Sequence, residues 1–194
     1  MTRNKKPVLD SLHAFNEATG SWEELPPMIT PCEGAASCVI GNELFLAGGY
    51  GPYRHEMSHA FDRLQIYDIV ARTWRFGAPI PEPWSSDWEV KGLVVDGKFF
   101  VMHLLKGTGL RITPATLVYD PSSDTWASES DEPWREEFRG IRNACVHKGR
   151  LVVFTRNGVF ERATDGSLSS CEDRWPEDRW HYAAFSVCES VILG

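Results

Sequence analysis

One interval constrains this chain more than any other feature, because its aromatic landmarks recur every 52 residues. Stepping 52 residues back or forward from Tyr67 and Trp74 lands on the same kind of pair each time. The three pairs are Phe15 with Trp22, Tyr67 with Trp74, and Tyr119 with Trp126. A fixed period of this length is typical of propellers and solenoids, in which each repeat is one supersecondary unit. The sequence therefore predicts an array of similar units.

Each unit also has a first half. Three segments place a Gly-containing pair between two apolar runs: 38–49, 94–102 and 146–154. Asp96-Gly97 in the second segment is the strongest short hairpin signal in a sequence. One unit is therefore predicted to hold four short strands: A and B in the hairpin, C ending at the aromatic residue, and D starting at the Trp. Four-stranded units repeated at about 50 residues are propeller blades rather than helical repeats.

The residues at these landmarks resemble the kelch motif. A double glycine follows an apolar strand, then come a Tyr and a Trp, and Leu25-Pro26-Pro27-Met28 resembles the tail of a kelch strand D. The resemblance covers about residues 8–194 and implies an all-β, kelch-type β-propeller similar to the central domain of galactose oxidase. The residues that it marks as the structural repeat are Gly48, Gly49, Tyr67, Trp74, Tyr119 and Trp126.

The later units depart from this pattern. The double glycine becomes His103-Leu104 in the second hairpin and Thr155-Arg156 in the third. Phe160 stands where the strand C aromatic of the third unit is expected, and no Trp follows it at the expected offset. These departures make the later blades less regular without changing the predicted fold class.

The predicted organisation is a basic arm at residues 1–7 followed by a propeller at 8–194. About three full four-stranded blades and two half blades are expected, with units at 8–28 (half), 35–77, 90–128, 142–171 and 182–194 (half). The first half unit holds strands C and D, and the last holds strands A and B. Two arrangements are open: a partial arc of a larger ring, or a closed ring of four blades.

Composition narrows the classes of partner. The net charge of −7 over 194 residues argues against a surface that follows nucleic-acid phosphates. No uninterrupted apolar run approaches 18 residues, so we expect no membrane partner and a cytoplasmic location, with the nucleus as an alternative. Five cysteines at irregular spacing, without a CxxC pair, are expected to be reduced thiols; three of them, Cys38, Cys145 and Cys188, fall in or beside strand A segments.

The connections suggest where a partner binds. In an antiparallel four-strand meander, the A-to-B and C-to-D turns lie on one edge, and the B-to-C and D-to-A connections lie on the other. All the long connections fall in the second class, and binding residues concentrate on long loops held by a rigid scaffold. Trp22, Trp74 and Trp126 are expected to pack between blades. The candidate partner-binding residues are Tyr53, Arg54, His55, Trp84, Trp88, Trp134, Arg135, Arg139, Arg142 and Trp180.

Signals for catalysis are weak. His55 and His59 have a metal-ligand spacing that works on a helix, but they lie in a predicted loop. There is no GxSxG nucleophile motif, and Gly107-Thr108-Gly109 is not followed by a helix or a Lys-Thr pair. We therefore expect no catalytic, cofactor or metal residues and no enzyme activity.

Two functions remain open. The first is a protein-interaction module that binds a protein partner through the long loops. The alternative is a kelch-fold enzyme with a dispersed site, such as a sugar epimerase or mutarotase. The Pro-rich stretch 74–83 is similar to kelch repeats of plant F-box receptors, which recruit proteins for ubiquitination, so a role as a ubiquitin-ligase substrate adaptor is considered. No F-box segment precedes residue 8, so the adaptor role is not carried over to this chain.

Overall fold

Every regular element that the structure describes is a β-strand. The structure is a computed structural model that describes residues 8–49, 51, 62–81, 89–104, 116–128, 143–155, 158–163 and 167–171. Its strands form one two-stranded and three four-stranded antiparallel sheets, each in simple chain order. The prediction of an all-β kelch-type fold is confirmed.

The strand bounds follow the four sheets. The two-stranded sheet consists of β1 (Leu12–Asn16) and β2 (Ser21–Leu25). The first full sheet consists of β3 (Ala36–Ile40), β4 (Glu43–Ala47), β5 (Leu64–Asp68) and β6 (Thr73–Phe76). The second consists of β7 (Glu89–Val95), β8 (Lys98–Leu104), β9 (Thr116–Asp120) and β10 (Thr125–Ser128). The third consists of β11 (Asn143–His147), β12 (Arg150–Thr155), β13 (Gly158–Arg162) and β14 (Leu168–Ser170).

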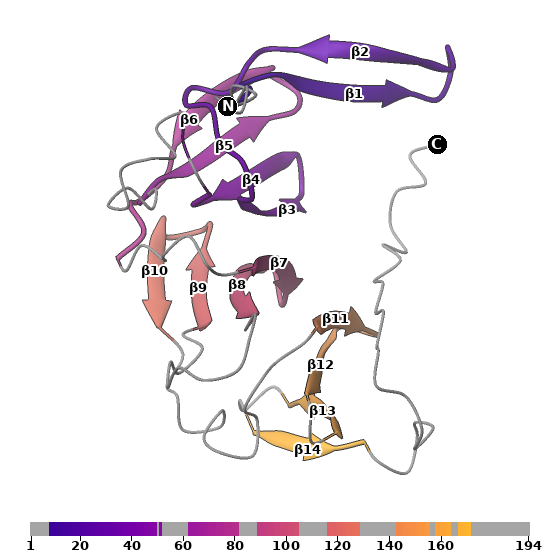
Figure 1. Ribbon diagram of the computed structural model, residues 1–194, viewed down its shortest axis with the longest axis vertical. Helices are drawn as coiled ribbons and strands as arrows, with labels where there is room; N and C mark the ends of the chain where they lie inside the picture. The colour runs from indigo at the N-terminus through magenta and orange to yellow at the C-terminus, as the bar shows by residue number, and fades with distance from the viewer. Residues whose placement is uncertain are drawn as a thin grey trace, which may run out of the picture.

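The sheets follow one another as the blades of an arc. Figure 1 shows the hairpin β1–β2 at one end of the arc and the sheet β11–β14 at the other. The first strands of neighbouring full blades, β3 with β7 and β7 with β11, lie against each other. Strand A is therefore the inner strand of each blade, and strand D is the outer one.

Local turn chemistry explains why the strands end where they do. The residue after each strand C aromatic is Asn16, Asp68 or Asp120, and its side-chain oxygen accepts hydrogen bonds from backbone N–H groups two or three residues later. Asp and Asn favour such turns because their short side chains mimic a backbone acceptor. In the A-to-B hairpins, Asp96-Gly97 and Lys148-Gly149 have φ angles of 50 and 72°, and 50 and 76°. Two consecutive positive φ angles fit a type I′ turn.

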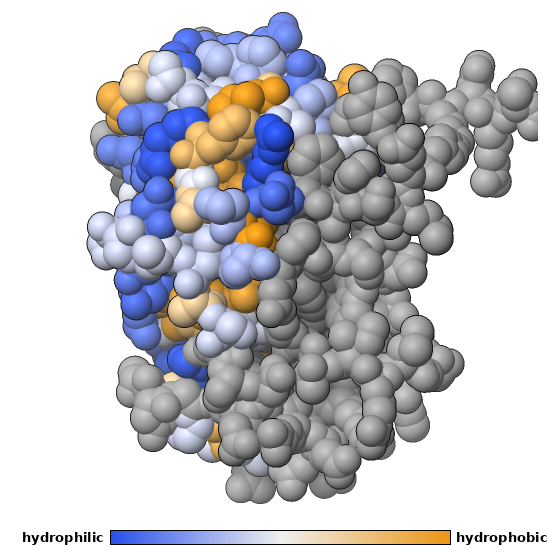
Figure 2. Space-filling model, turned by 90° about the vertical axis from the view of Figure 1, so that its left-hand side faces the viewer, coloured by the Kyte–Doolittle hydropathy of each residue, from blue (hydrophilic) through white to orange (hydrophobic). Residues whose placement is uncertain are grey.

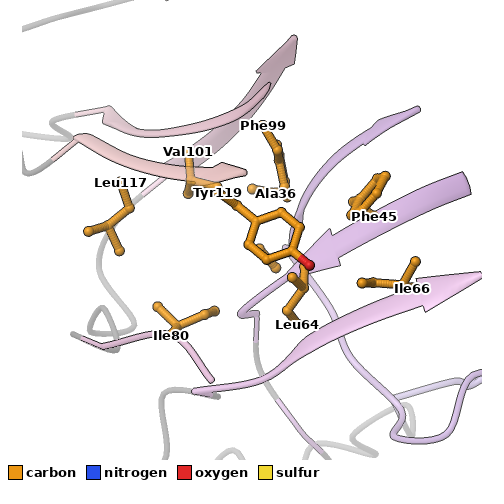
Figure 3. Close-up of a cluster of buried hydrophobic side chains, with 10 residues drawn as sticks. Ala36, Phe45, Leu64, Ile66, Ile80, Phe99, Val101, Leu117 and Tyr119 are labelled. Atoms are coloured by element: carbon orange, nitrogen blue, oxygen red, sulfur yellow. The ribbon is translucent and has the colours of Figure 1, made fainter. Parts of the chain in front are cut away.

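Two of the three hydrophobic clusters among the described residues lie between blades, and the third comes from the third full blade alone. Apolar side chains on one side of the first full blade pack against side chains of the second, among them Phe45, Leu64 and Ile66 against Phe99 and Tyr119. Figure 3 shows the Tyr119 ring reaching from its own blade into the space beside Leu64 and Ile66. A second cluster joins the second blade to the third. Each blade thus depends on its neighbour for a buried face.

The repeated Trp residues close these junctions. The indole Nε1–H of Trp74 donates to the carbonyl of Pro26 at 2.8 Å, and that of Trp126 donates to the carbonyl of Ala78 at 2.9 Å. Both acceptors lie 48 residues before their Trp, just past strand D of the preceding sheet. The rings pack on Tyr67 and Tyr119, with centroids 5.0 and 5.1 Å apart. The two Trp side chains are therefore held in the same way at both junctions.

The inner strands approach each other unusually closely at Gly92. A Cβ atom at this position would lie 2.3 Å from the Ser37 carbonyl oxygen and 2.7 Å from the Ser37 nitrogen. Because both contacts are to backbone atoms, only glycine allows β7 to lie this close to β3.

One expectation about the repeat is wrong. Trp22 does not pack between blades: its side chain is 70% exposed, and its partner Phe15 is 51% exposed. The two rings contact each other edge to face at 5.4 Å. The described residues contain no sheet before β1–β2, so nothing in this part of the chain covers the pair.

The third blade fills the same positions with other residues. Phe160 lies opposite Val153, and Leu117 of the second blade occupies the same place opposite Val101. The expectation that Phe160 occupies the strand C aromatic position is therefore wrong. Phe160 lies two residues before that position. Continuing the register places Arg162 at the Tyr position, with its guanidinium carbon 5.4 Å from the Phe100 ring centroid. Leu168, paired with Arg162, takes the Trp position and packs into the junction.

Two predicted segments cannot be placed. The arm at 1–7 and the half unit at 182–194 lie outside the described residues, so the unit boundaries as a whole stay predictions.

Candidate partner-binding face

The two edges of the blades differ in the described residues. The turn edge carries the A-to-B and C-to-D turns, which are the pairs 41–42, 96–97 and 148–149, the four-residue turns 17–20, 69–72 and 121–124, and the five-residue connection 163–167. The loop edge carries the B-to-C and D-to-A connections, described at 26–35, 48–49, 62–63 and 77–81. The loop edge is where sequence analysis placed the candidate partner-binding residues.

Gln65 anchors the loop edge at its best-described point. This buried side chain, 3% exposed, accepts a hydrogen bond from Thr30 N at 2.8 Å and donates one to Thr30 O at 3.0 Å. An amide that satisfies both backbone groups of one residue fixes that residue firmly. The connection 26–35 is therefore held against the start of β5.

The double glycine supports the same connection. Gly49 has a φ of 92°, and a Cβ atom there would lie 2.9 Å from the Glu33 carbonyl oxygen and 3.0 Å from Ala35 N. Gly48 N donates to the Arg63 carbonyl at 3.0 Å. The glycines thus allow the end of β4 to lie directly against the connection from the preceding sheet.

An exposed aromatic residue with a stacked arginine lies on this edge. The Arg63 guanidinium carbon is 5.2 Å from the centroid of the Phe76 ring, and Phe76 is 43% exposed. Ile29 on the neighbouring connection is 46% exposed. Sequence analysis did not name Arg63 or Phe76 as candidates; the signal that could have found them is their register, since Phe76 pairs with Gln65, two residues after Arg63.

The outer side of the arc is mixed in character. Figure 2 looks onto the side of β6 and β10 and shows a narrow hydrophobic strip flanked by hydrophilic residues. Ion pairs run along the blades in this region and beyond: Arg75 with Glu43 at 2.8 Å, and Lys98 with Asp120 at 3.0 Å. At half-exposed sites such pairs contribute little to stability, about 0 to 1 kcal/mol each.

All ten candidate partner-binding residues lie outside the described residues. They are Tyr53, Arg54, His55, Trp84, Trp88, Trp134, Arg135, Arg139, Arg142 and Trp180. Of the structural repeat, Tyr67 and Tyr119 are buried, and Trp74 and Trp126 are partly exposed at the junctions.

The described cysteines are placed as core thiols rather than reactive groups. Cys145 and Cys171 are buried, Cys32 and Cys38 are half-buried, and all four are free. Burial raises the pKa of Cys32, Cys38 and Cys145, which keeps these thiols protonated near neutral pH. Cys188 lies outside the described residues.

The described residues contain no group of three or more His, Cys, Asp and Glu side chains placed to hold a metal ion. Nor does any helix in them have the length and apolar character needed to cross a membrane.

Comparison with known proteins finds a kelch motif in this chain. A family model described as the kelch motif matches residues 31–81, which include all of β3 to β6. Kelch-like protein terF from Aspergillus terreus is 29% identical over 135 residues, which cover 66% of this chain and 29% of the relative. Residues 31–81 thus carry a kelch motif, and the chain is similar to a kelch-like protein over 66% of its length. The matched range contains the whole β3–β6 sheet, and with it Gly48, Gly49, Tyr67 and Trp74, the residues that sequence analysis assigned to the repeat.

Other kelch relatives match over similar stretches. A putative F-box/kelch-repeat protein from Arabidopsis thaliana is 23% identical over 154 residues, covering 78% of this chain and 34% of the relative. Kelch repeat and BTB domain-containing protein 12 from Danio rerio is 29% identical over 120 residues, covering 58% of this chain and 19% of the relative. The chain thus spans about a third or less of the length of these relatives.

Proposed function

We propose that this chain is a protein-interaction module whose partner binds the loop edge. The proposal rests on the difference in connection length between the two edges of the blades. In the first two full blades the A-to-B and C-to-D turns have two or four residues, whereas the B-to-C and D-to-A connections have ten or more; in the third blade only two residues join β12 to β13. A stack of blades held by buried junctions is a rigid base, and long loops on a rigid base are the usual site of recognition.

The chemistry of the loop edge suits a protein partner. Arg63 stacked on the half-exposed Phe76 is the pairing of Arg and aromatic residues that is enriched in interface anchors. The ten candidate residues from the sequence, rich in Trp and Arg, are predicted to lie on the same edge. The net charge of −7 makes nucleic acid a poor partner.

The relatives support a substrate-adaptor role within this proposal. Their names combine kelch repeats with an F-box or a BTB domain, and one, from Danio rerio, is called Kelch-like ECH-associated protein 1A. By analogy, this chain supplies the part that holds the recruited protein. An intracellular location, in the cytoplasm or the nucleus, follows from the same analogy. The enzyme with a dispersed site stays as the alternative hypothesis.

Capture from native lysate tests the loop edge. The wild type is compared with Trp84→Ala combined with Arg139→Ala, which removes one aromatic and one basic candidate. The matched control, Val70→Ala combined with Lys148→Ala, removes an apolar and a basic side chain from the turn edge, where both residues are exposed. Thermal unfolding of all three proteins shows whether the substitutions leave the fold intact.

The expected result is a set of captured proteins that the loop-edge variant loses and the control keeps. Truncating a single interface anchor commonly weakens binding by about 2 kcal/mol, roughly 30-fold, so two together should abolish capture. If both variants capture the same set as the wild type, or if only the control loses it, the loop-edge proposal is wrong.

A further inference from the structure

Three exposed side chains lie together on the loop edge of the first full blade. Phe76 pairs with Gln65 across β5 and β6, so both side chains leave the same face of the sheet. Gln65 holds Thr30, and Ile29 precedes Thr30 in the connection from the preceding sheet. The guanidinium of Arg63 lies over the Phe76 ring. We call Arg63, Phe76 and Ile29 the anchor patch.

The fold does not require the residue types of the anchor patch. The second full blade has the same register, and its junction binds the Trp126 indole as the first junction binds that of Trp74. In the repeat 52 residues later, the places of Arg63, Phe76 and Ile29 are taken by Ala115, Ser128 and Pro81. A cation, an aromatic ring and a branched aliphatic side chain are therefore not needed to build a junction, which leaves recognition as their role.

The charge of Arg63 is not neutralised by any described residue. Its guanidinium forms no ion pair in the described part of the chain. Two other arginines of this blade are paired, Arg72 with Glu23 and Arg75 with Glu43. The aromatic ring beneath Arg63 orients the guanidinium but accepts none of its in-plane N–H donors. A carboxylate matches this planar fork with two parallel hydrogen bonds, so the complement of the patch is an acidic group.

We propose that the anchor patch binds a segment of the partner protein that carries one Asp or Glu carboxylate beside a large apolar side chain. The carboxylate pairs with Arg63, and the apolar side chain covers Phe76 and Ile29. An exposed ion pair alone contributes little to binding. Apolar groups packed around the pair exclude water and make it an anchor. This inference rests on the proposed function and names the chemistry of its partner.

The surroundings of the patch favour a single carboxylate over an acidic run. The net charge of the chain is −7, and the exposed side chains of Asp62 and Glu33 lie on the same edge. A run of acidic residues would be repelled by this charge, because like charges brought together oppose association. A basic segment would suit the net charge but would place its own cation against Arg63. One carboxylate therefore satisfies Arg63 with the least repulsion.

Selection from a peptide library tests this chemistry. A displayed library of random short peptides is selected on the full chain and, in parallel, on Arg63→Ala combined with Phe76→Ser. This variant carries the residues that the second blade has at these places, so it should keep the fold, which thermal unfolding checks. We expect the wild type alone to enrich peptides with one acidic residue beside an apolar one. No enrichment, enrichment without an acidic residue, or the same enrichment on both proteins would overturn the proposal.

The affinity of the most enriched peptide tests the ion pair itself. Fluorescence anisotropy should show binding weakened about 30-fold by Arg63→Ala, and less by Arg63→Lys, which keeps the charge but not the planar fork. Lys148→Ala is the matched control, because it removes an exposed cation from the turn edge, and it should leave the affinity unchanged.

A double-mutant cycle locates the carboxylate. Replacing the acidic residue of the peptide by its amide should weaken binding to the wild type but have little further effect on Arg63→Ala. An equal loss on both proteins would show that the carboxylate binds elsewhere and would overturn the proposal.

Lysate capture separates failure of this inference from failure of the proposed function. If Arg63→Ala with Phe76→Ser captures the same proteins as the wild type while Trp84→Ala with Arg139→Ala loses them, the anchor patch is wrong and the loop-edge proposal stands. If neither variant changes the captured set, both proposals are wrong.

Discussion

The phenol of Tyr119 donates a 2.6 Å hydrogen bond to Asp124, whose Oδ1 also accepts one from Ala78 N at 2.8 Å. Asp124 belongs to the C-to-D turn of the second full blade, and Ala78 follows strand D of the first. One carboxylate oxygen therefore joins the two blades beside the Trp126 indole, which donates to the carbonyl of the same Ala78. The side chains of Asp124 and Trp126 thus both bind the backbone of Ala78, at one point of the junction.

The charge on Asp124 should make stability depend on pH. The hydrogen bond from Tyr119, then that from Ala78 N, lowers the pKa of Asp124 below its ordinary 3.8. A lowered folded-state pKa contributes stability above pH 4, and that stability is lost as the pH falls through the folded value. Asp124→Asn removes the charge but keeps a hydrogen-bond acceptor, and Asn tolerates the φ of 52° at this position. The substitution should therefore lower the free energy of unfolding at pH 7 by about 0.5 to 1 kcal/mol.

Urea unfolding at pH 7 and pH 2.5 measures this difference. The curves of wild type and Asp124→Asn should separate at neutral pH and approach each other in acid. Asp96→Asn is the matched control, since Asp96 also has a positive φ of 50° in a turn, and it should change little. A gap between wild type and Asp124→Asn that is the same at both pH values would contradict the role given to the charge.

The aromatic and turn positions of the first two full blades could be predicted from the sequence. The 52-residue period places Tyr67, Tyr119, Trp74 and Trp126 because the same slot recurs at each junction. The hydrogen bond from Ala78 N to Asp124 could not be predicted. The two residues are 46 positions apart, and the contact depends on the left-handed backbone conformation of Asp124. A periodic pattern predicts packing that recurs in every unit, but it does not predict a contact that occurs at only one junction.

The 52-residue period did not predict two further features, the exposure of Trp22 and the residue types of the third blade. Trp22 occupies the same repeat position as Trp74 and Trp126, so the period predicted a neighbouring sheet, but the described residues contain none that covers it. In the third blade, Arg162 and Leu168 fill the slots of the Tyr and the Trp, because the register sets the position and the residue type is free to change. The ten candidate residues for partner binding remain predictions.

Removing a hydroxyl should have opposite effects at Tyr67 and Tyr119. The Tyr67 hydroxyl is buried and has no hydrogen-bond partner in the described structure. The position that Asp124 occupies in the second blade is held by Arg72 in the first, so the acceptor carboxylate is missing. Pro26 corresponds to Ala78 and has no N–H. Tyr67→Phe should therefore be neutral or stabilising by up to about 1 kcal/mol. Tyr119→Phe should destabilise by about 1 kcal/mol. Chemical denaturation of the two variants compares them; equal losses would show that the junctions do not differ as described.

The close approach of the inner strands should make Gly92 intolerant of any side chain. Gly92→Ala would press a methyl group onto backbone atoms of Ser37, which cannot rotate away, so we expect a loss of about 3 kcal/mol or more. Gly20→Asn is the control, because a Cβ atom there meets nothing within 4 Å and Asn tolerates a φ of 65°. The prediction fails if thermal unfolding shows similar small shifts for both.

The indole hydrogen bonds should contribute measurably at each junction. Trp126→Phe keeps an aromatic ring beside Tyr119 but removes the donor to Ala78 O, which should cost about 1 to 2 kcal/mol. Trp74→Phe removes the equivalent bond to Pro26 O and should cost a similar amount. Unfolding free energies from denaturant titration decide this, and a loss at only one of the two positions would mean that the junctions are not equivalent.

Hydrogen–deuterium exchange of the chain, with and without a captured partner, tests the central functional claim most directly. Our account predicts that the partner slows exchange in loop-edge peptides covering residues 26–35, 62–63 and 77–88, while the turns at 17–20, 69–72 and 121–124 exchange as before. Protection confined to those turns, with the loop-edge peptides unchanged, would contradict it.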